Sequence, residues 1–270
     1  MVKTEPRFGE VEAYERFMGR WSRAVATPFL RWLRAAANAE WLDVGCGTGI
    51  LSELVLAACV PATIVGIDAT PEQVGRAANR MVDSRACFAI ADAQALPFDN
   101  ASFDIVAAAL VLNFIPDPPR ALREMRRVVR PGGMVCVFVW DFEPELSPSG
   151  PLRKALRSLG IEVLPLPGTP ASPLPALAAL FGQAGLESVE ATTIEVAVSF
   201  ANFDDFWESQ TTLYSPTTKI INSLGQDERK SLYAALRTTL SEQGDGEVRY
   251  SARANAIKST CAKSGARVSG

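Results

Sequence analysis

The chain has 270 residues, of which 48% are hydrophobic and 21% are charged, and its formal net charge is −3. This composition is typical of a globular protein with a buried core, and it argues against a nucleic-acid partner, because phosphate backbones are bound by concentrated positive charge. The chain contains no histidine, which excludes imidazole bases, Ser-His or Cys-His triads and histidine-ligated zinc.

Two further features concern location and redox state. No apolar run approaches the roughly 18 residues of a membrane-spanning helix, and the N-terminal residues lack the apolar core of a signal peptide. We therefore expect a cytoplasmic protein without a membrane span. The five cysteines are odd in number and show no CxxC spacing, so we interpret them as reduced thiols that mostly fill the core.

The first predicted unit is an N-terminal helical cap over residues 1–38. Aromatic and basic residues recur at helical spacing between residues 14 and 37. We interpret this pattern as two helices that pack on a sheet. On a functional interpretation, the same segment also forms a wall of the active site.

Residues 39–142 alternate short apolar runs with amphipathic helical patterns. Both faces of a parallel sheet are covered by helices, so its strands are apolar throughout. The alternation is the βαβα signature of a doubly wound α/β fold, wound by right-handed crossovers. The apolar runs are EWLDV, TIVGID, CFAI, FDIVAAAL and MVCVFVW, and the helical patterns cover residues 51–58, 71–82 and 118–129.

The composition changes after the fifth apolar run. Residues 143–186 are rich in proline and glycine, and we predict an insertion or lid that covers the carboxyl edge of the sheet. Residues 187–262 are predicted to complete the same domain, and the tail at 263–270 is expected to fray. Within these segments we expect helices near 152–159, 175–184, 203–209 and 227–242 and strands at 186–200 and 247–259.

The strongest functional signal is the run DVGCGTG at residues 43–49, between a predicted strand and the helix that follows it. Gly45 and Gly47 let the backbone turn tightly and admit a ligand without a Cβ in the way. The first N–H groups of the next helix are free to bind that ligand. Dinucleotide-binding turns use a similar pattern, but they carry a third glycine where this chain has Ile50.

Carboxylates end the next two predicted strands. Asp68 closes VGID, where it can accept hydrogen bonds from both hydroxyls of a ribose. Asp92 follows in IADAQALPF, where it can accept a hydrogen bond from an adenine amino group. A turn or helix-cap role is the alternative for Asp92.

Together with SFDIVAAALVLNFIPDP and RPGG, these motifs make residues 41–140 resemble the class I S-adenosylmethionine-dependent methyltransferases. More narrowly, they resemble the small-molecule branch related to the ubiquinone and menaquinone biosynthesis methyltransferases, methyltransferase type 11. The segment YERFMGRWSR resembles one branch of that family, in which it folds over the cofactor. The resemblance implies a Rossmann-like, mostly parallel seven-stranded sheet, S-adenosylmethionine as cofactor and a small-molecule methyl acceptor.

The resemblance also implies individual roles. Many relatives carry a histidine at or beside the position of Asn113, so histidine-assisted deprotonation does not transfer to this chain. The implied roles are a loop-ordering Asp43, a methionine site lined by Gly45, Cys46 and Gly47, a ribose ligand Asp68, an adenine site of Ala69, Asp92, Ala93 and Gln94, a backbone contact to the methionine amino group at Leu110, and Asn113 facing the transferring methyl.

Other side chains are weaker candidates. Arg20 can pair with the cofactor carboxylate, although a solvated or stacked surface role is the alternative. If the acceptor needs deprotonation, Tyr14, Asp117 and Asp141 are candidate bases. Their ordinary alternatives are a core hydroxyl, a helix cap before Pro118 and an exposed loop charge. No cluster of acids and amides indicates a metal site.

We predict methyl transfer to an O, N or C atom by in-line displacement, aided by proximity and desolvation. One alternative is a cofactor-binding scaffold without turnover. An NAD-dependent oxidoreductase is disfavoured by Ile50 and by the lack of a His or Tyr-x-x-x-Lys base. A nucleic-acid or protein methyltransferase would show an Asn/Asp-Pro-Pro-Tyr loop or a basic groove, whereas Asn113 is followed by Phe114. The possibility of a homo-oligomer is left open.

Overall fold

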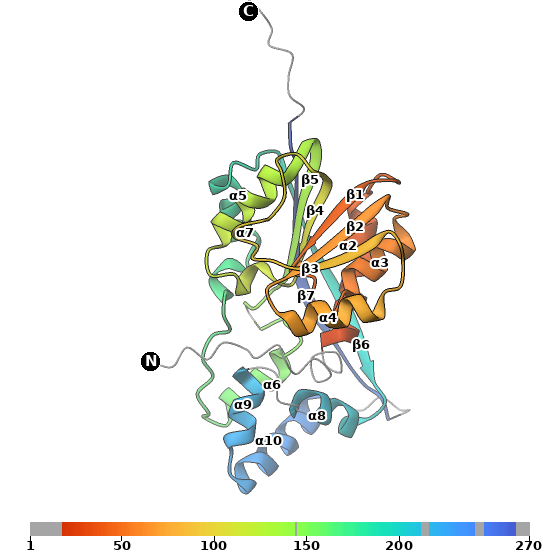
Figure 1. Cartoon of the computed structure of the whole chain (residues 1–270). Helices are drawn as coiled ribbons and strands as arrows, with labels where there is room; N and C mark the ends of the chain where they lie inside the picture. The colour runs from red at the N-terminus through yellow and green to blue at the C-terminus, as the bar shows by residue number, and fades with distance from the viewer. Residues whose placement is uncertain (1–17, 144, 212–215, 241–245, 263–270) are drawn as a thin grey trace, which may run out of the picture.

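The computed structural model describes residues 18–143, 145–211, 216–240 and 246–262. Its centre is a seven-stranded sheet in the order β3-β2-β1-β4-β5-β7-β6 (Figure 1). The first five strands are parallel, and β7 is antiparallel to both β5 and β6, which confirms the predicted doubly wound, mostly parallel sheet. The strands are β1 (Glu40–Val44), β2 (Thr63–Asp68), β3 (Ala86–Ile90), β4 (Phe103–Ala109), β5 (Val129–Trp140), β6 (Val189–Phe200) and β7 (Val248–Thr260).

Each face of the sheet carries its own hydrophobic core. Along β4, Ile105 and Ala107 belong to one core, while Val106 and Ala108 belong to the other, because successive side chains of a strand point to opposite faces. Helices α2 (Arg20–Leu33) and α3 (Ile50–Ala58) cover the first face, and α5 (Pro118–Val128) and α7 (Leu174–Gln183) cover the second. Helix α4 (Pro71–Arg80) packs against β2 and β3.

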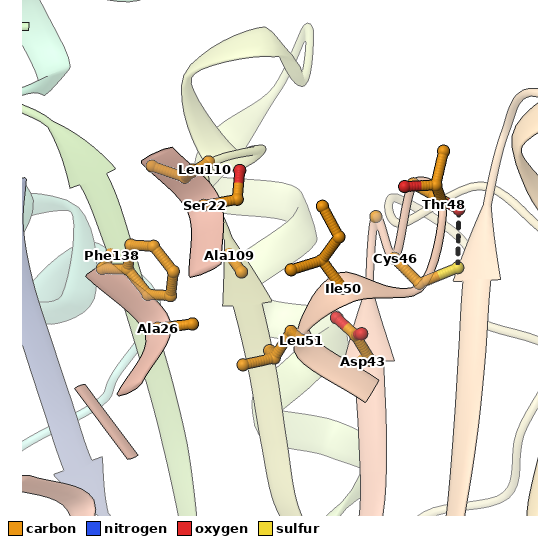
Figure 2. Close-up of a pocket in the computed structure, with 12 residues that line it drawn as sticks. Ser22, Ala26, Asp43, Cys46, Thr48, Ile50, Leu51, Ala109, Leu110 and Phe138 are labelled. Atoms are coloured by element: carbon orange, nitrogen blue, oxygen red, sulfur yellow. Dashed lines mark hydrogen bonds between the residues drawn. The ribbon is translucent and has the colours of Figure 1, made fainter. Parts of the chain in front are cut away.

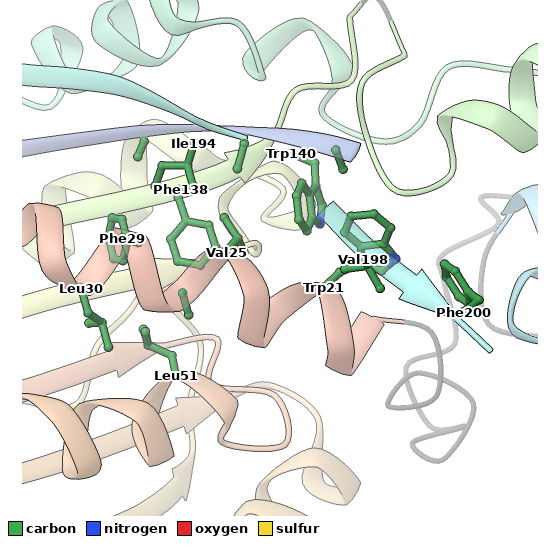
Figure 3. Packing of buried hydrophobic residues seen from close by; sticks show 14 of the residues in the cluster. Trp21, Val25, Phe29, Leu30, Leu51, Phe138, Trp140, Ile194, Val198 and Phe200 are labelled. Atoms are coloured by element: carbon green, nitrogen blue, oxygen red, sulfur yellow. The ribbon is translucent and has the colours of Figure 1, made fainter. Parts of the chain in front are cut away.

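Helix α2 is the described part of the predicted N-terminal cap. Trp21, Val25, Phe29 and Leu33 recur every four residues and are fully buried, so they form one stripe that faces the sheet. Figure 3 shows Phe29 and Val25 directed toward Phe138 of β5. The expected first helix of the pair and Tyr14 lie outside the described residues.

The last strand of the chain lies inside the sheet. Trp140 at the end of β5 pairs with Ala254, whereas the β6–β7 pairing continues to Phe200 and Val248. The paired ends of β6 and β7 therefore extend past the carboxyl edge of β5. They lead into α8 (Phe203–Thr211), α9 (Pro216–Ser223) and α10 (Gln226–Thr239), which gather with α6 (Gly150–Ser158) in a helical group beyond that edge (Figure 1).

The Pro-rich stretch contributes to two places. Helix α6 contacts α10 in the helical group, while α7 is a layer helix against α5 and the sheet. Between them, η3 (Thr169–Ala171) leads to Ser172, which is tied to the sheet. The Nδ2 atom of Asn255 donates to the Ser172 carbonyl at 2.9 Å, and Ser172 Oγ accepts from the Phe142 N–H at 3.2 Å. In the parts of the chain that are described, no helix combines the length and apolarity that a membrane crossing needs.

Candidate cofactor site

The loop between β1 and α3 forms the floor of the site. Gly45, Gly47 and Gly49 all have positive φ, at 70°, 53° and 82°, a region that residues with a Cβ rarely adopt. A Cβ on Gly45 would also lie 2.4 Å from Cγ2 of Val111. The Cys46 N–H donates to the Ile67 carbonyl at 2.8 Å, which holds the loop against β2. The glycines are therefore needed for the shape of this loop.

Asp43 lies under the loop and is fully buried. Ser52 Oγ donates to its Oδ2 at 2.7 Å, which ties the end of β1 to α3. Burial raises the pKa of Asp43 from 3.8 to about 7, with a smaller contribution from the neighbouring charge of Asp68, while the Ser52 hydrogen bond opposes the shift. Asp43 thus joins β1 to the start of α3 beneath the loop.

Asp68 at the end of β2 connects two turns. Its Oδ2 accepts from the Gly47 N–H at 3.0 Å, and its Oδ1 accepts from the Thr70 N–H at 2.9 Å. Because each carboxylate oxygen has two lone-pair sites, both oxygens can accept one further hydrogen bond. Asp68 is only partly buried, so those positions are open to a diol such as a ribose.

Asp92 and Gln94 lie on the neighbouring turn. The Ala91 N–H donates to the Asp68 carbonyl at 3.1 Å, which joins this turn to the end of β2. The Gln94 N–H and Nε2 donate to Oδ1 of Asp92 at 2.8 and 3.0 Å. The Gln94 N–H holds the pKa of Asp92 below its ordinary value, so the carboxylate is an ionised acceptor. Ala69 is exposed and Ala93 is half-buried on these turns.

A cleft opens beside the glycine loop. Ser22 and Ala26, one turn apart on α2, form one side (Figure 2). Leu110 after β4 and Phe138 of β5 close the end of the cleft. The full lining is Ser22, Ala26, Asp43, Gly45, Cys46, Gly47, Thr48, Ile50, Leu51, Ala109, Leu110 and Phe138.

Leu110 has an unusual backbone at this position. Its φ is +59°, which is uncommon for a residue with a bulky side chain and marks local strain. The Leu110 N–H donates to the Phe138 carbonyl at 2.8 Å, so the strained residue is fixed to β5. The turn brings Leu110 into the lining of the cleft.

Three polar atoms that border the cleft have no hydrogen-bond partner among the described residues: Ser22 Oγ, Asp43 Oδ1 and Thr48 Oγ1. Unpaired buried polar atoms are rare in folded proteins, and these three are free to bind a polar ligand. The N-terminus of α3 opens at the same place without a side-chain cap, so its N–H groups add partial positive charge. The hydroxyl and helix N–H donors suit a carboxylate of a ligand, and the Asp43 oxygen suits an ammonium group. Together they fit a ligand end that carries both groups.

Several predicted residues lie elsewhere. Arg20 does not line the cleft: its guanidinium pairs with Asp205 at 3.3 Å and lies 4.6 Å from the ring centroid of Phe200. Asn113 is buried, and its Nδ2 donates to the Pro167 carbonyl at 3.3 Å, so it is held beneath residues 167–168.

The two candidate bases within the described residues also have structural partners. Asp117 caps α5 by accepting from the Arg120 N–H at 2.9 Å, which confirms the cap interpretation. Asp141 is buried, and its Oδ2 accepts from Nε and Nη2 of Arg253 at 2.8 and 2.6 Å. The alternative of an exposed loop charge for Asp141 is therefore wrong.

Sequence reasoning missed Ser22, Ala26, Thr48 and Phe138 as lining residues. Ser22 and Ala26 could have been found from the helical period, because they lie one position beyond the apolar stripe of α2. Arg23 pairs with Glu53 of α3 at 2.8 Å, which holds this face of α2 beside the loop. In the sequence, Phe138 is one of several apolar residues in a strand, so nothing distinguishes it as a residue that lines the cleft.

The sheet order, the glycine loop and the carboxylates on successive turns define a class I S-adenosylmethionine-dependent methyltransferase. A family model for the methyltransferase domain matches residues 42–137. The ubiquinone/menaquinone biosynthesis C-methyltransferase UbiE of Ralstonia pickettii is 33% identical over 175 residues, which cover 55% of this chain and 68% of that protein. The chain belongs to this methyltransferase family.

Two further comparisons extend this result. The 27-O-demethylrifamycin SV methyltransferase of Amycolatopsis mediterranei is 39% identical over 118 residues, which are 42% of each protein. The chain thus spans less than half of that relative. The crystal structure of the YcgJ protein from Bacillus subtilis shares the fold with a TM-score of 0.57 at 18% identity, over 88% of this chain and 98% of that one.

Proposed function

We propose that this protein transfers a methyl group from S-adenosylmethionine to a small-molecule acceptor. The observation that carries the proposal is the cleft between α2 and the glycine loop, with its unpaired Ser22, Asp43 and Thr48 atoms. The named functions of relatives support the same reaction class, and the net charge of −3 favours a small acceptor over a nucleic acid.

The chain's own residues would divide the cofactor among three places. Ser22, Thr48 and the start of α3 would hold the methionine carboxylate, with Asp43 Oδ1 available to the ammonium group. Asp68 would bind the ribose hydroxyls, and Asp92 would accept from the adenine amino group. When bound, the cofactor supplies a methyl group that its sulfonium already activates.

The protein's contribution is alignment and exclusion of water rather than proton transfer from the cleft. Among the lining residues, only Asp43 and Cys46 titrate. Asp43 is buried under the loop, and burial raises the pKa of the Cys46 thiol far above its ordinary value. Positioning of the acceptor can supply up to roughly 7–11 kcal/mol of the barrier reduction, so a base in the cleft is not required for an activated acceptor.

Calorimetric titration of the purified protein with S-adenosylhomocysteine tests the proposal, with NADH as the parallel control. We expect micromolar binding of S-adenosylhomocysteine and no binding of NADH. Absence of the first, or binding of the second, would overturn the cofactor assignment. If the cofactor binds but no acceptor from a broad panel of phenols, amines and carbon acids is methylated, the scaffold alternative is favoured.

A further inference from the structure

Three aromatic side chains meet beyond the end of the cleft, and we call them the aromatic cluster: Trp21, Trp140 and Tyr250. The rings of Trp21 and Tyr250 are 4.9 Å apart between centroids, and those of Trp21 and Trp140 are 6.1 Å apart and nearly perpendicular. Phe200 stacks on Tyr250 at 5.8 Å with almost parallel planes. The cluster thus joins α2, the carboxyl end of β5 and the overhanging end of β7, and Phe200 of β6 packs against it.

The aromatic cluster is continuous with the proposed cofactor site. Trp21 directly precedes Ser22, which borders the cleft. Trp140 lies two residues after Phe138 on the same face of β5, and both belong to the core under α2. Figure 3 shows Trp21 and Trp140 beside each other, with Phe138 further along the strand. A molecule placed among these rings would therefore lie next to the end of the cleft.

The aromatic cluster contains two indole donors with no acceptor at ordinary hydrogen-bond distance. This holds for Nε1 of Trp140 and Nε1 of Trp21 among the described residues, although the side chains are 4% and 0% exposed, and the Trp21 indole has only a minor interaction with the Tyr250 hydroxyl. Leaving such groups unpaired destabilises the fold unless a ligand or water pairs with them. Trp41 has an unpaired Nε1 as well, but it lies near the opposite end of β1, away from the carboxyl edge.

Gln210 of α8 adds an unpaired acceptor. Its Nε2 lies 3.4 Å from the hydroxyls of Tyr250 and Ser209, while its Oε1 has no partner among the described residues. The hydroxyl of Tyr250 donates to the Pro148 carbonyl at 2.8 Å, and Ser209 donates to the Phe206 carbonyl at 2.6 Å. Each hydroxyl has used its only proton, so it can only accept a hydrogen bond from Gln210. The amide nitrogen of Gln210 must therefore face the two hydroxyls, and Oε1 is left without a donor.

We propose that the aromatic cluster and Gln210 form the binding site of the methyl acceptor, and that the acceptor is an uncharged ring compound with a carbonyl oxygen and a hydroxyl or amine. The carbonyl oxygen accepts from the two indole N–H groups, and the hydroxyl or amine donates to Gln210 Oε1. The apolar rings of the cluster pack against the ring of the acceptor. This inference rests on the proposed function, since it locates the second substrate of that reaction.

The charges around the cluster explain why the acceptor is uncharged. Arg20 lies over Phe200 but is paired with Asp205, and Asp141 after β5 is paired with Arg253. Burial also raises the pKa of Tyr250 far above its ordinary value. Its hydroxyl therefore stays protonated and does not act as a base. Each of these charged side chains of the described residues is thus already paired and would not neutralise a charged acceptor.

The rings are in contact, so an occupant must separate them. Tyr250 belongs to a paired strand, whereas α8, which carries Gln210, packs mainly against α9 and β6. We expect α8 to be the wall that moves when the acceptor enters.

The test uses the full chain labelled with ¹⁵N in tryptophan and saturated with S-adenosylhomocysteine. The indole signals are assigned with Trp→Phe variants. The probe is 6-hydroxy-1-tetralone, with 1-tetralone and the hydrocarbon tetralin as matched compounds that lack one or both polar groups. We expect the Trp21 and Trp140 signals to shift with the probe, less with 1-tetralone and least with tetralin, while the signal of Trp32, near the C-terminal end of α2, stays in place.

A matched pair of variants makes the result quantitative. Trp140→Phe keeps an aromatic ring but removes the N–H, and we expect it to weaken probe binding about 5- to 10-fold. Trp207→Phe, on the side of α8 that contacts Tyr233, should leave probe binding within about twofold. Equal effects of the two variants, or unmoved Trp21 and Trp140 signals, would overturn the acceptor site.

The outcome is separable from the test of the proposed function. Binding of S-adenosylhomocysteine without any response of the two indoles rejects the acceptor site and leaves the methyltransferase assignment intact. Shifts of the two indoles in a protein that fails to bind S-adenosylhomocysteine support a ring-binding site and reject the methyltransferase assignment.

Discussion

The main-chain N–H of Gly47 donates a hydrogen bond of 3.0 Å to Oδ2 of Asp68. The carboxylate assigned to the ribose therefore also holds the loop assigned to the methionine end of the cofactor. Because Thr70 binds the other oxygen, the carboxylate is fixed before any ligand arrives. Such a preorganised arrangement lowers the cost of ordering the site on binding.

Replacing Asp68 by Ala should weaken the binding of S-adenosylhomocysteine by about 100-fold or more. Two charge-assisted hydrogen bonds to the ribose are lost, each worth about 1.5–3 kcal/mol, and the loop loses its anchor. Calorimetry measures the effect, with the exposed Asp99→Ala as control. Affinity within threefold of the parent protein would reject the ribose assignment.

Two glycines of the loop should respond differently to alanine. In Gly45→Ala the new Cβ meets Val111 at 2.4 Å, and overpacking of this kind costs about 1–3 kcal/mol of unfolding free energy. In Gly47→Ala no atom lies within 4 Å of the Cβ, so we expect a smaller loss of stability but a clear loss of cofactor affinity.

Thermal unfolding and calorimetry of both variants check this pair. A Gly47→Ala protein less stable than Gly45→Ala would contradict the packing argument, because both positions share a positive φ and differ mainly in the contact with Val111.

The raised pKa of Asp43 predicts a pH dependence of stability. The folded state keeps the Asp43 proton up to about pH 7, whereas the unfolded chain releases it near the ordinary aspartate pKa of 3.8. Stability from this group is thus present at low pH and is lost as pH rises toward 7. Between pH 5.5 and 7.5 the loss should be about 2 kcal/mol.

Urea unfolding at the two pH values should show this difference in the parent protein and not in Asp43→Asn. The control is Asp83→Asn, since Arg85 lowers the pKa of Asp83 to about 2 and the residue does not titrate in this range. An unchanged pH dependence in Asp43→Asn would show that another group is responsible.

For the Arg20–Asp205 ion pair we predict only small effects on stability and on cofactor affinity. Both side chains are about one-third exposed, at 33% and 34%, and ion pairs of this kind contribute about 0–1 kcal/mol. We expect Arg20→Ala to change unfolding free energy by less than about 1 kcal/mol and S-adenosylhomocysteine affinity by less than about threefold. A tenfold loss of affinity would show instead that Arg20 leaves Asp205 for the cofactor.

The sequence predicted those parts of the fold that local patterns encode. Strands that are apolar on both faces, helices that begin at Pro71 and Pro118 and the glycine loop all have short-range signatures, and the structure places them as expected. Helix α9 was missed because residues 216–223 show no regular apolar period.

Long-range contacts were less accessible. Nothing local shows that Arg20 meets Asp205 or that Asn113 meets Pro167, because each contact depends on where distant segments pack. The same holds for the cleft wall at Ser22 and for the aromatic cluster, whose members come from three separate elements. The sequence therefore indicated the loop, the carboxylates and the N-terminal segment as one wall, but not which residues of that wall line the cleft.

The placement of β7 between β5 and β6 also affects how the chain is made. Strands β1 to β5 are synthesised first and can assemble as a parallel sheet on the ribosome, with β5 as a temporary open edge. Strand β6 emerges next but pairs with β7 alone among the described strands, so it must wait until the helices between them have been translated. During that interval β5 and β6 expose unpaired backbone, and this is the stage at which chaperones would protect the nascent protein from aggregation.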